Sequence, residues 1–305
     1  MQRFKLTKGS RGIDAIAISP DGTLVACVDR SDSHNVWVFD VASGAGRSQK
    51  GDTNRIFDLV FSPDQSQFVT VGSKHIKFWD PSSLEGNKGI FGGAGEPTSF
   101  ACAAYGDDGT CYTGGANSLV YFWNGRQCGG TIKAHSGGFI SALRFSEGKL
   151  YSGGKDGFVK IIDPASQSEI GSIDFGGVLI RAIDVKGGNA LVGCRNGCIY
   201  EVIIATNEKS VIMESHSDGE VWGLSIVNQD TILTSGDDNQ LKAWSVSQRK
   251  CVSRGITSTE ARKVKRGGAS SLTQFADSQC SRAIAYNTGN GQVAIGHNDG
   301  TLTIR

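Results

Sequence analysis

A three-part pattern recurs seven times along the chain. Each copy begins with a short apolar segment, such as IFDLVFS at Ile56–Ser62 or FISALRFS at Phe139–Ser146. A second segment that ends in small residues follows, and a tight polar turn then leads to a third apolar segment, such as HIKFWD ending at Asp80. Short strands with turn residues at even spacing predict an all-β array of repeated units. Because a repeat constrains the whole fold, this pattern is stronger evidence for the fold than the features of any single segment.

The third segment measures the length of the repeat. Its seventh position, counted from the turn residue, falls at Phe39, Trp79, Trp123, Ile162, Val202, Trp244 and Arg305. The first five intervals are 39 to 44 residues long, and the last is 61. A period of about 40–45 residues is typical of the four-stranded blades of a β-propeller. The longer last interval indicates an insertion, which we place at residues 257–277.

We therefore predict a single seven-bladed β-propeller over residues 1–305. The predicted blades span residues 9–51, 52–92, 93–134, 135–174, 175–214, 215–256 and 278–305, the last together with 3–7. Candidates for the fourth strands are Lys88–Gly92, Thr131–Ala134, Glu169–Asp174, Ser210–Glu214 and Cys251–Ile256. The sequence ends on the third strand of the seventh blade, so we expect Arg3–Thr7 to pair with Thr301–Arg305 and close the ring. Closure removes exposed strand edges, which otherwise favour aggregation.

Composition excludes several other classes. The chain has 42 glycines but only 5 prolines, which fits many tight turns. No apolar run has the roughly 18 residues needed to span a bilayer, and Met1–Lys8 has no apolar core of signal-peptide length. The 8 cysteines are irregularly spaced, and no histidine accompanies the closest pair, Cys194 and Cys198. We expect buried thiols, no metal, no cofactor, no membrane association and a cytoplasmic location.

An Asp or Asn precedes most of the third strands, and glycine follows it at Gly157, Gly197 and Gly300. Asn-Gly and Asp-Gly predict a hairpin turn in which both residues have positive φ. The arrangement resembles WD repeats, which often link this Asp to a His, a Ser or Thr, and a Trp. The sixth copy offers His216, Asp238 and Trp244, with Thr234 or Ser235 as the hydroxyl, and we assign Ser235 to this structural tetrad. The fourth copy offers His135, Ser152 and Asp156, but has Ile162 in place of Trp.

A Ser, a His and an Asp together also suggest a hydrolase. Such a serine would lie within a strand here, and not on the strained G-x-S-x-G turn that exposes a nucleophile. Neither a G-x-G-x-x-G that opens a helix nor a phosphate-binding G-x-x-x-x-G-K-[ST] is present. We therefore predict a structural role for these residues, no enzymatic activity and no small-molecule substrate.

Several blades resemble one family more closely. HSDGEVWGLS (His216–Ser225), IRAIDVKGGNALVGCRNGCIYE (Ile180–Glu201) and VTVGSKHIKFW (Val69–Trp79) are similar to blades of the echinoderm microtubule-associated-protein-like (EMAP-like) WD-repeat proteins. The resemblance implies a propeller scaffold that associates with microtubules or tubulin in the cytoskeleton. Members usually carry an N-terminal coiled coil and a second propeller, which this sequence lacks, so we expect a piece of a longer protein.

Basic residues are concentrated in one segment. From Arg249 to Arg266 there are seven Lys or Arg and one acid, Glu260, whereas the whole chain has a net charge of +1. We take Arg262, Lys263, Lys265 and Arg266 as the candidate contact for an acidic partner such as tubulin, because exposed cations steer association. A solvated loop without a partner is the alternative. The segment lacks interleaved aromatic residues, so we do not expect nucleic-acid binding. A generic adaptor that binds peptides or proteins on a propeller face is the second functional hypothesis.

Overall fold

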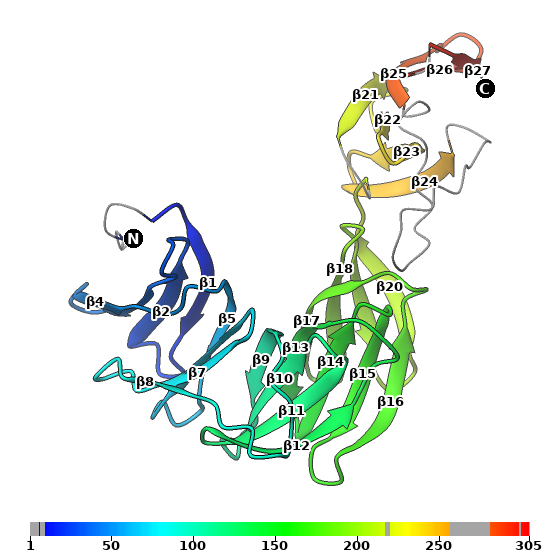
Figure 1. Cartoon of the computed structure of the whole chain (residues 1–305). Coiled ribbons are helices and arrows are strands. Elements are labelled where there is room, and N and C mark those ends of the chain that lie inside the picture. The colour runs from blue at the N-terminus through cyan, green and yellow to red at the C-terminus, as the bar shows by residue number, and fades with distance from the viewer. Residues whose placement is uncertain (1–5, 7–9, 217–219, 257–280, 299, 305) are drawn as a thin grey trace. The chain divides into compact units, whose positions relative to one another are not determined.

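The computed structural model describes residues 6, 10–216, 220–256, 281–298 and 300–304 (Figure 1). Within these ranges every regular element is a β-strand, and the strands form seven antiparallel sheets, which we number blade 1 to blade 7. Six sheets have four strands and the last has three. Neighbouring strands in each sheet are consecutive in the chain, so every sheet is a simple meander. The prediction of an all-β fold built from seven propeller blades is confirmed.

The strands of the first four blades are as follows. Blade 1 contains β1 (Ile13–Ile18), β2 (Leu24–Asp29), β3 (Val36–Asp40) and β4 (Gly46–Gln49). Blade 2 contains β5 (Ile56–Phe61), β6 (Phe68–Gly72), β7 (His75–Trp79) and β8 (Gly86–Lys88). Blade 3 contains β9 (Phe100–Tyr105), β10 (Cys111–Gly115), β11 (Leu119–Asn124) and β12 (Gln127–Lys133). Blade 4 contains β13 (Ile140–Ser146), β14 (Lys149–Gly154), β15 (Phe158–Asp163) and β16 (Ser168–Asp174).

The remaining blades follow the same order. Blade 5 contains β17 (Ile180–Lys186), β18 (Asn189–Cys194), β19 (Ile199–Ile203) and β20 (Glu208–Met213). Blade 6 contains β21 (Val221–Ile226), β22 (Thr231–Gly236), β23 (Gln240–Ser245) and β24 (Lys250–Ile256). Blade 7 contains β25 (Ser281–Tyr286), β26 (Val293–His297) and β27 (Leu302–Ile304). No helix in the described ranges has the length and hydropathy of a transmembrane span.

The outer strands of blades 1 and 2 differ from the sequence prediction. β4 was not predicted, and β8 ends at Lys88, where the predicted strand Lys88–Gly92 begins. Each of these strands starts at a glycine that lies opposite an aromatic residue of the third strand, Gly46 opposite Phe39 and Gly86 opposite Trp79. A Cβ atom at Gly86 would lie 2.6 Å from the Trp79 ring, so only glycine lets the outer strand come this close.

The chain divides into two compact units, residues 1–194 with 202–209 and residues 195–201 with 210–305. In the first unit the core consists of apolar layers between successive blades. Val28 and Val38 of blade 1 pack with Leu59 and Trp79 of blade 2, and similar layers join blades 2 to 3 and 3 to 4. In the second unit a smaller layer around Ile295 joins blades 6 and 7. Each blade therefore depends on its neighbour to bury its apolar faces.

Small residues at the ends of the second strands permit this packing. A Cβ atom at Gly153 in β14 would lie 2.6 Å from a methyl carbon of Ile180 in the next blade. At Gly114 in β10, a Cβ atom would lie 2.7 Å from Ile140. At both positions any side chain larger than a hydrogen atom would collide with the next blade.

The predicted turn geometry is wrong in detail. In Asp156-Gly157 and Asn196-Gly197 only the glycine has positive φ, 84° and 76°. The side chain of the first residue instead accepts a hydrogen bond from the backbone N–H two residues later, as Asp156 does from Phe158 at 3.2 Å. This local bond fixes the turn without a positive φ at Asp.

Ring closure stays a prediction. Of Arg3–Thr7, only Leu6 lies within the described residues, and it packs against Cys27, Trp37 and Phe39 of blade 1. These three side chains lie on the face of blade 1 opposite to the one that packs on blade 2. The insertion at 257–277 lies outside the described residues.

Asp58 on β5 connects two blades through its carboxylate. It accepts hydrogen bonds from the backbone N–H of Ala103 in blade 3, at 2.9 Å, and from that of Leu59, at 2.8 Å. Burial raises the pKa of Asp58 to about 6, and the two N–H donors offset only part of this effect. The folded protein therefore binds a proton on the Asp58 carboxyl group more tightly than the unfolded chain does.

We predict that Asp58 stabilises the fold most below about pH 4 and that this contribution is lost as the pH rises through about 6. An asparagine at this position would keep an oxygen acceptor but never ionise. From pH 4 to pH 7, Asp58→Asn should therefore gain roughly 1–2 kcal/mol in unfolding free energy relative to the parent. Urea denaturation at several pH values measures this difference. Asp107→Asn, at an exposed position, is the control. Parallel pH profiles for parent and Asp58→Asn would contradict the prediction.

Candidate functional site

Blade 6 contains a chain of four side chains joined by hydrogen bonds. His216 Nδ1 lies 2.7 Å from Asp238 Oδ1, and its Nε2 lies 2.8 Å from Thr234 Oγ1. The indole N–H of Trp244 donates to the same Thr234 hydroxyl at 2.6 Å. Since a carboxylate only accepts, Nδ1–H donates to Asp238, and with a neutral imidazole Nε2 accepts the hydroxyl proton. These hydrogen bonds join His216 and the turn before β23 to Thr234 in the middle of the blade.

The hydroxyl in this chain belongs to Thr234, so the assignment of Ser235 is corrected. Side chains alternate between the two faces of a strand, and Thr234 and Ser235 therefore point to opposite faces of β22. Ser235 instead accepts a hydrogen bond from Ser281 in blade 7, at 2.7 Å. It thus contributes to the contact between two blades.

Blade 4 has the same network without the tryptophan. His135 lies 2.9 Å from both Asp156 Oδ1 and Ser152 Oγ. Ser152 is fully buried and His135 is 2% exposed. A nucleophile must reach a substrate, and the buried Ser152 hydroxyl cannot. The Ser–His–Asp set of blade 4 therefore has a structural role.

Blade 2 contains a network that the sequence interpretation missed, in which the His and the acid exchange places. Asp52 lies ahead of β5, where blade 6 has His216, and His75 begins β7, next to the turn where blade 6 has Asp238. His75 Nδ1 lies 2.9 Å from Asp52 Oδ2, and its Nε2 lies 2.8 Å from Thr70 Oγ1. Trp79 donates to Thr70 at 2.8 Å. Burial lowers the pKa of His75, and the Asp52 carboxylate opposes that shift.

Each blade has a β-bulge near the start of its first strand. In every blade the register between the first two strands shifts by one residue at this point. The unpaired residues are Asp14, Phe57, Ala101, Ser141, Arg181, Trp222 and Arg282. Bulges commonly redirect a side chain next to a binding site. Sequence reasoning did not find these residues, because a bulge leaves no composition signal.

In the first unit the bulge residues of blades 1 and 2 lie among arginines. Asp14 accepts hydrogen bonds from Arg30 at 2.7 Å and from Arg55 at 3.3 Å. The guanidinium carbon of Arg55 lies 5.8 Å from the centre of the Phe57 ring, which is 39% exposed. More than half of each arginine side chain remains accessible, so an acidic partner could contact both.

In the second unit the bulge residues of blades 6 and 7 stack on each other. The guanidinium carbon of Arg282 lies 4.3 Å from the centre of the Trp222 ring. Asp237 accepts a hydrogen bond from the Trp222 indole at 3.0 Å and forms an ion pair with Arg282 at 3.3 Å. Trp222 is 48% exposed although it makes both of these contacts. Trp and Arg are among the residue types that contribute most of the binding energy at protein interfaces.

The basic residues Arg262, Lys263, Lys265 and Arg266 lie outside the described residues, so their role as a partner contact stays a proposal. Among the described cysteines all are free thiols; six are buried and Cys251 is half-buried. In the described ranges no group of three or more His, Cys, Asp or Glu side chains is arranged to hold a metal ion.

Comparison with known proteins gives consistent matches. The family described as "WD domain, G-beta repeat" matches residues 46–80, 126–163 and 207–245. The ciliary WD repeat-containing protein ctxp80 of Euplotoides octocarinatus is 43% identical over 99% of this chain and 43% of its own length. The mouse echinoderm microtubule-associated protein-like 3 is 30% identical over 80% of this chain and 31% of its own length. Human echinoderm microtubule-associated protein-like 1 is 26% identical over 77% of this chain and 30% of its own length. The chain thus spans less than half the length of these relatives.

We predict that breaking the blade 6 network destabilises the fold. His216→Ala or Asp238→Asn should lower the unfolding free energy by roughly 1–3 kcal/mol, because each leaves a buried polar partner unsatisfied. The identity of the hydroxyl gives a sharper test through double-mutant cycles in chemical denaturation. His216→Ala should be non-additive with Thr234→Val and additive with Ser235→Ala. The opposite pattern would return the role to Ser235.

Proposed function

Because the chain is a WD40-repeat protein related to the echinoderm microtubule-associated protein-like proteins, we propose that it is a protein-interaction scaffold that associates with microtubules or tubulin. The observation that carries this proposal is the 43% identity to a ciliary WD repeat protein along 99% of the chain. The proposal places the protein in the cytoplasm, on the cytoskeleton, and assigns it no enzymatic activity. WD40 repeats are in general non-enzymatic scaffolds, and the buried Ser152 of blade 4 agrees with that role.

Exposed cations support an acidic partner. Arg30 and Arg55 keep side-chain exposures of 52% and 58% beside Asp14. The proposed contact from sequence, Arg262, Lys263, Lys265 and Arg266, would add four further positive charges. Charges of this kind raise the rate of encounter with an oppositely charged surface and make binding sensitive to salt.

A second candidate is an adaptor that holds peptides or proteins at the bulge residues. The exposed Trp222, stacked on Arg282, favours it. An adaptor of this kind needs no cytoskeletal partner, so the two candidates are separated by which partner binds.

For the first candidate we predict cosedimentation with microtubules at about 25 mM salt that weakens at about 150 mM, where charges are screened beyond about 8 Å. Replacing Arg262, Lys263, Lys265 and Arg266 by Ala should reduce binding and leave the melting temperature unchanged. If this variant binds as well as the parent, the basic segment is not the contact. If the parent does not bind even at low salt, microtubule association does not extend to this chain.

For the second candidate, peptides that bind the parent are first selected by phage display. We predict that Trp222→Ala lowers the affinity for these peptides by more than about tenfold, the loss typical of a central aromatic anchor. The Asp237–Arg282 ion pair would remain, so the melting temperature should hardly change. Ile170→Ala, which shortens another exposed apolar side chain, is the control. Equal affinity for the parent and Trp222→Ala would exclude the bulge of blade 6 as the anchor.

A further inference from the structure

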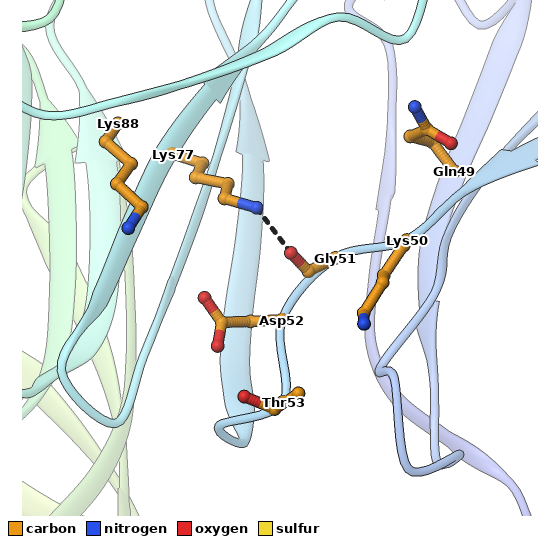
Figure 2. Close-up of a pocket in the computed structure, with 7 residues that line it drawn as sticks. All are labelled: Gln49, Lys50, Gly51, Asp52, Thr53, Lys77 and Lys88. Atoms are coloured by element: carbon orange, nitrogen blue, oxygen red, sulfur yellow. Dashed lines mark hydrogen bonds between the residues drawn. The ribbon is translucent and has the colours of Figure 1, made fainter.

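Three lysines from three different segments line one pocket of blade 2 (Figure 2). Lys50 follows β4, Lys77 lies on β7, and Lys88 ends β8. The pocket has a volume of about 320 Å³, and Gln49, Gly51, Asp52 and Thr53 complete its wall. Asp52 is the only acid among these residues.

The positive charge of this pocket is not balanced from within. The Asp52 carboxylate is engaged by His75 and by the backbone N–H of Asn54, both at 2.9 Å. Lys50 and Lys88 form no ion pair in the part of the chain that the structure describes.

Lys77 also lacks a carboxylate at hydrogen-bond distance. Its ammonium group donates to the carbonyl oxygen of Gly51 at 2.5 Å and lies 5.3 Å from the centre of the Trp79 ring. Burial lowers the pKa of Lys77, Asp52 opposes this, and the neighbouring Lys88 and Lys50 lower it further. An added anion would therefore be favoured at this point.

Blade 6 contains the same arrangement with its anion present. Lys242 occupies the strand position of Lys77, since it pairs with Thr234 as Lys77 pairs with Thr70. Its ammonium group donates to the carbonyl of Ser215 at 2.6 Å, as Lys77 does to that of Gly51. Arg254 pairs with Lys242 across the outer strand, as Lys88 pairs with Lys77. Each of the two blades therefore has a pair of cations, and the two pairs occupy equivalent positions.

Blades 2 and 6 differ at the residue that precedes this carbonyl group. Glu214 precedes Ser215 in blade 6, and Lys50 precedes Gly51 in blade 2. The Glu214 carboxylate is buried, with a side-chain exposure of 8%, and its Oε1 lies 3.1 Å from Lys242 and 3.2 Å from Arg254. Blade 4 likewise pairs its equivalent lysine, Lys160, with Glu169 at 2.8 Å. Only the lysine of blade 2 lacks its own glutamate among these three described blades.

We propose that the three-lysine pocket of blade 2 binds a glutamate side chain of an acidic peptide from a protein partner, in the place that Glu214 takes in blade 6. The occupant is a carboxylate because its counterpart in blade 6, Glu214, is one, and Glu214 is held by two cations in the equivalent positions. The third cation, Lys50, would add attraction for a neighbouring acidic residue of the same peptide. The site refines the scaffold role by giving the partner a chemistry, and it does not require the partner to be tubulin.

Titration of the whole chain with a fluorescently labelled decaglutamate peptide at low salt tests the site. The parent should bind the peptide, and a decaglutamine peptide should not bind. Lys50→Glu should weaken binding by at least about tenfold, because the new carboxylate occupies the pocket and one cation is lost. The same variant should keep or raise the melting temperature, since it supplies the ion pair that Glu214 supplies in blade 6. A general loss of charge would not give this second result.

Lys133→Glu is the matched control, because Lys133 is exposed and stands two residues before His135, as Lys50 stands two residues before Asp52. It makes the same change in charge and should leave binding unaltered. Equal weakening by both variants, or no weakening by Lys50→Glu, would overturn the proposal. Displacement of the peptide by inorganic phosphate, but not by chloride at equal ionic strength, would identify a phosphate site and also overturn it. Microtubule cosedimentation is a separate readout, so decaglutamate binding without cosedimentation keeps this site and removes only the cytoskeletal partner.

Discussion

The burial of each blade against its neighbour is the interaction on which the rest of the structure depends. A four-stranded meander has two apolar faces, and water would reach at least one of them in an isolated blade. Leu59 and Phe68 of blade 2 are almost fully buried because blade 1 covers them, and Phe100 of blade 3 lies in the layer shared with blade 2. Burying a side chain of this size contributes about 1.5–3 kcal/mol, so each shared layer outweighs any single hydrogen bond in the blade. Glycines such as Gly114 and Gly153 make the close approach possible.

Once the layers are in place, polar side chains can fix the loops. The networks centred on His75, His135 and His216 all join the segment before the first strand to the second strand and to the turn or strand that follows it. Blade 2 shows that the order of acid and imidazole along the chain is not essential. A carboxylate and an imidazole form the same bond from either side, so the pair can exchange positions while the Thr–Trp bond stays.

Much of the fold could be predicted from sequence because it rests on repetition. The strand pattern and the period located the first three strands of all seven blades, from β1 through β27. Details set by particular contacts between paired strands and their side chains could not be predicted. Thr234 and Ser235 are adjacent hydroxyls, and only the orientation of β22 decides which one meets His216. β8 begins at Gly86 because of the Trp79 ring, which no pattern of apolar residues indicates. The bulge residues Phe57 and Trp222 escaped for the same reason, since a register shift is a property of two paired strands.

Repetition within one chain also lets the blades serve as references for one another. Blades 2 and 6 share a lysine on the third strand, a cation opposite it on the outer strand, and a carbonyl that receives the lysine. With so much held constant, a single difference in charge can be assigned a physical consequence. Where Glu214 stands, both cations have a carboxylate partner within the blade. Where Lys50 stands, the same framework holds three lysines against the single carboxylate of Asp52. A propeller can in this way keep one backbone for stability and vary one loop position to decide which blade is open to a partner.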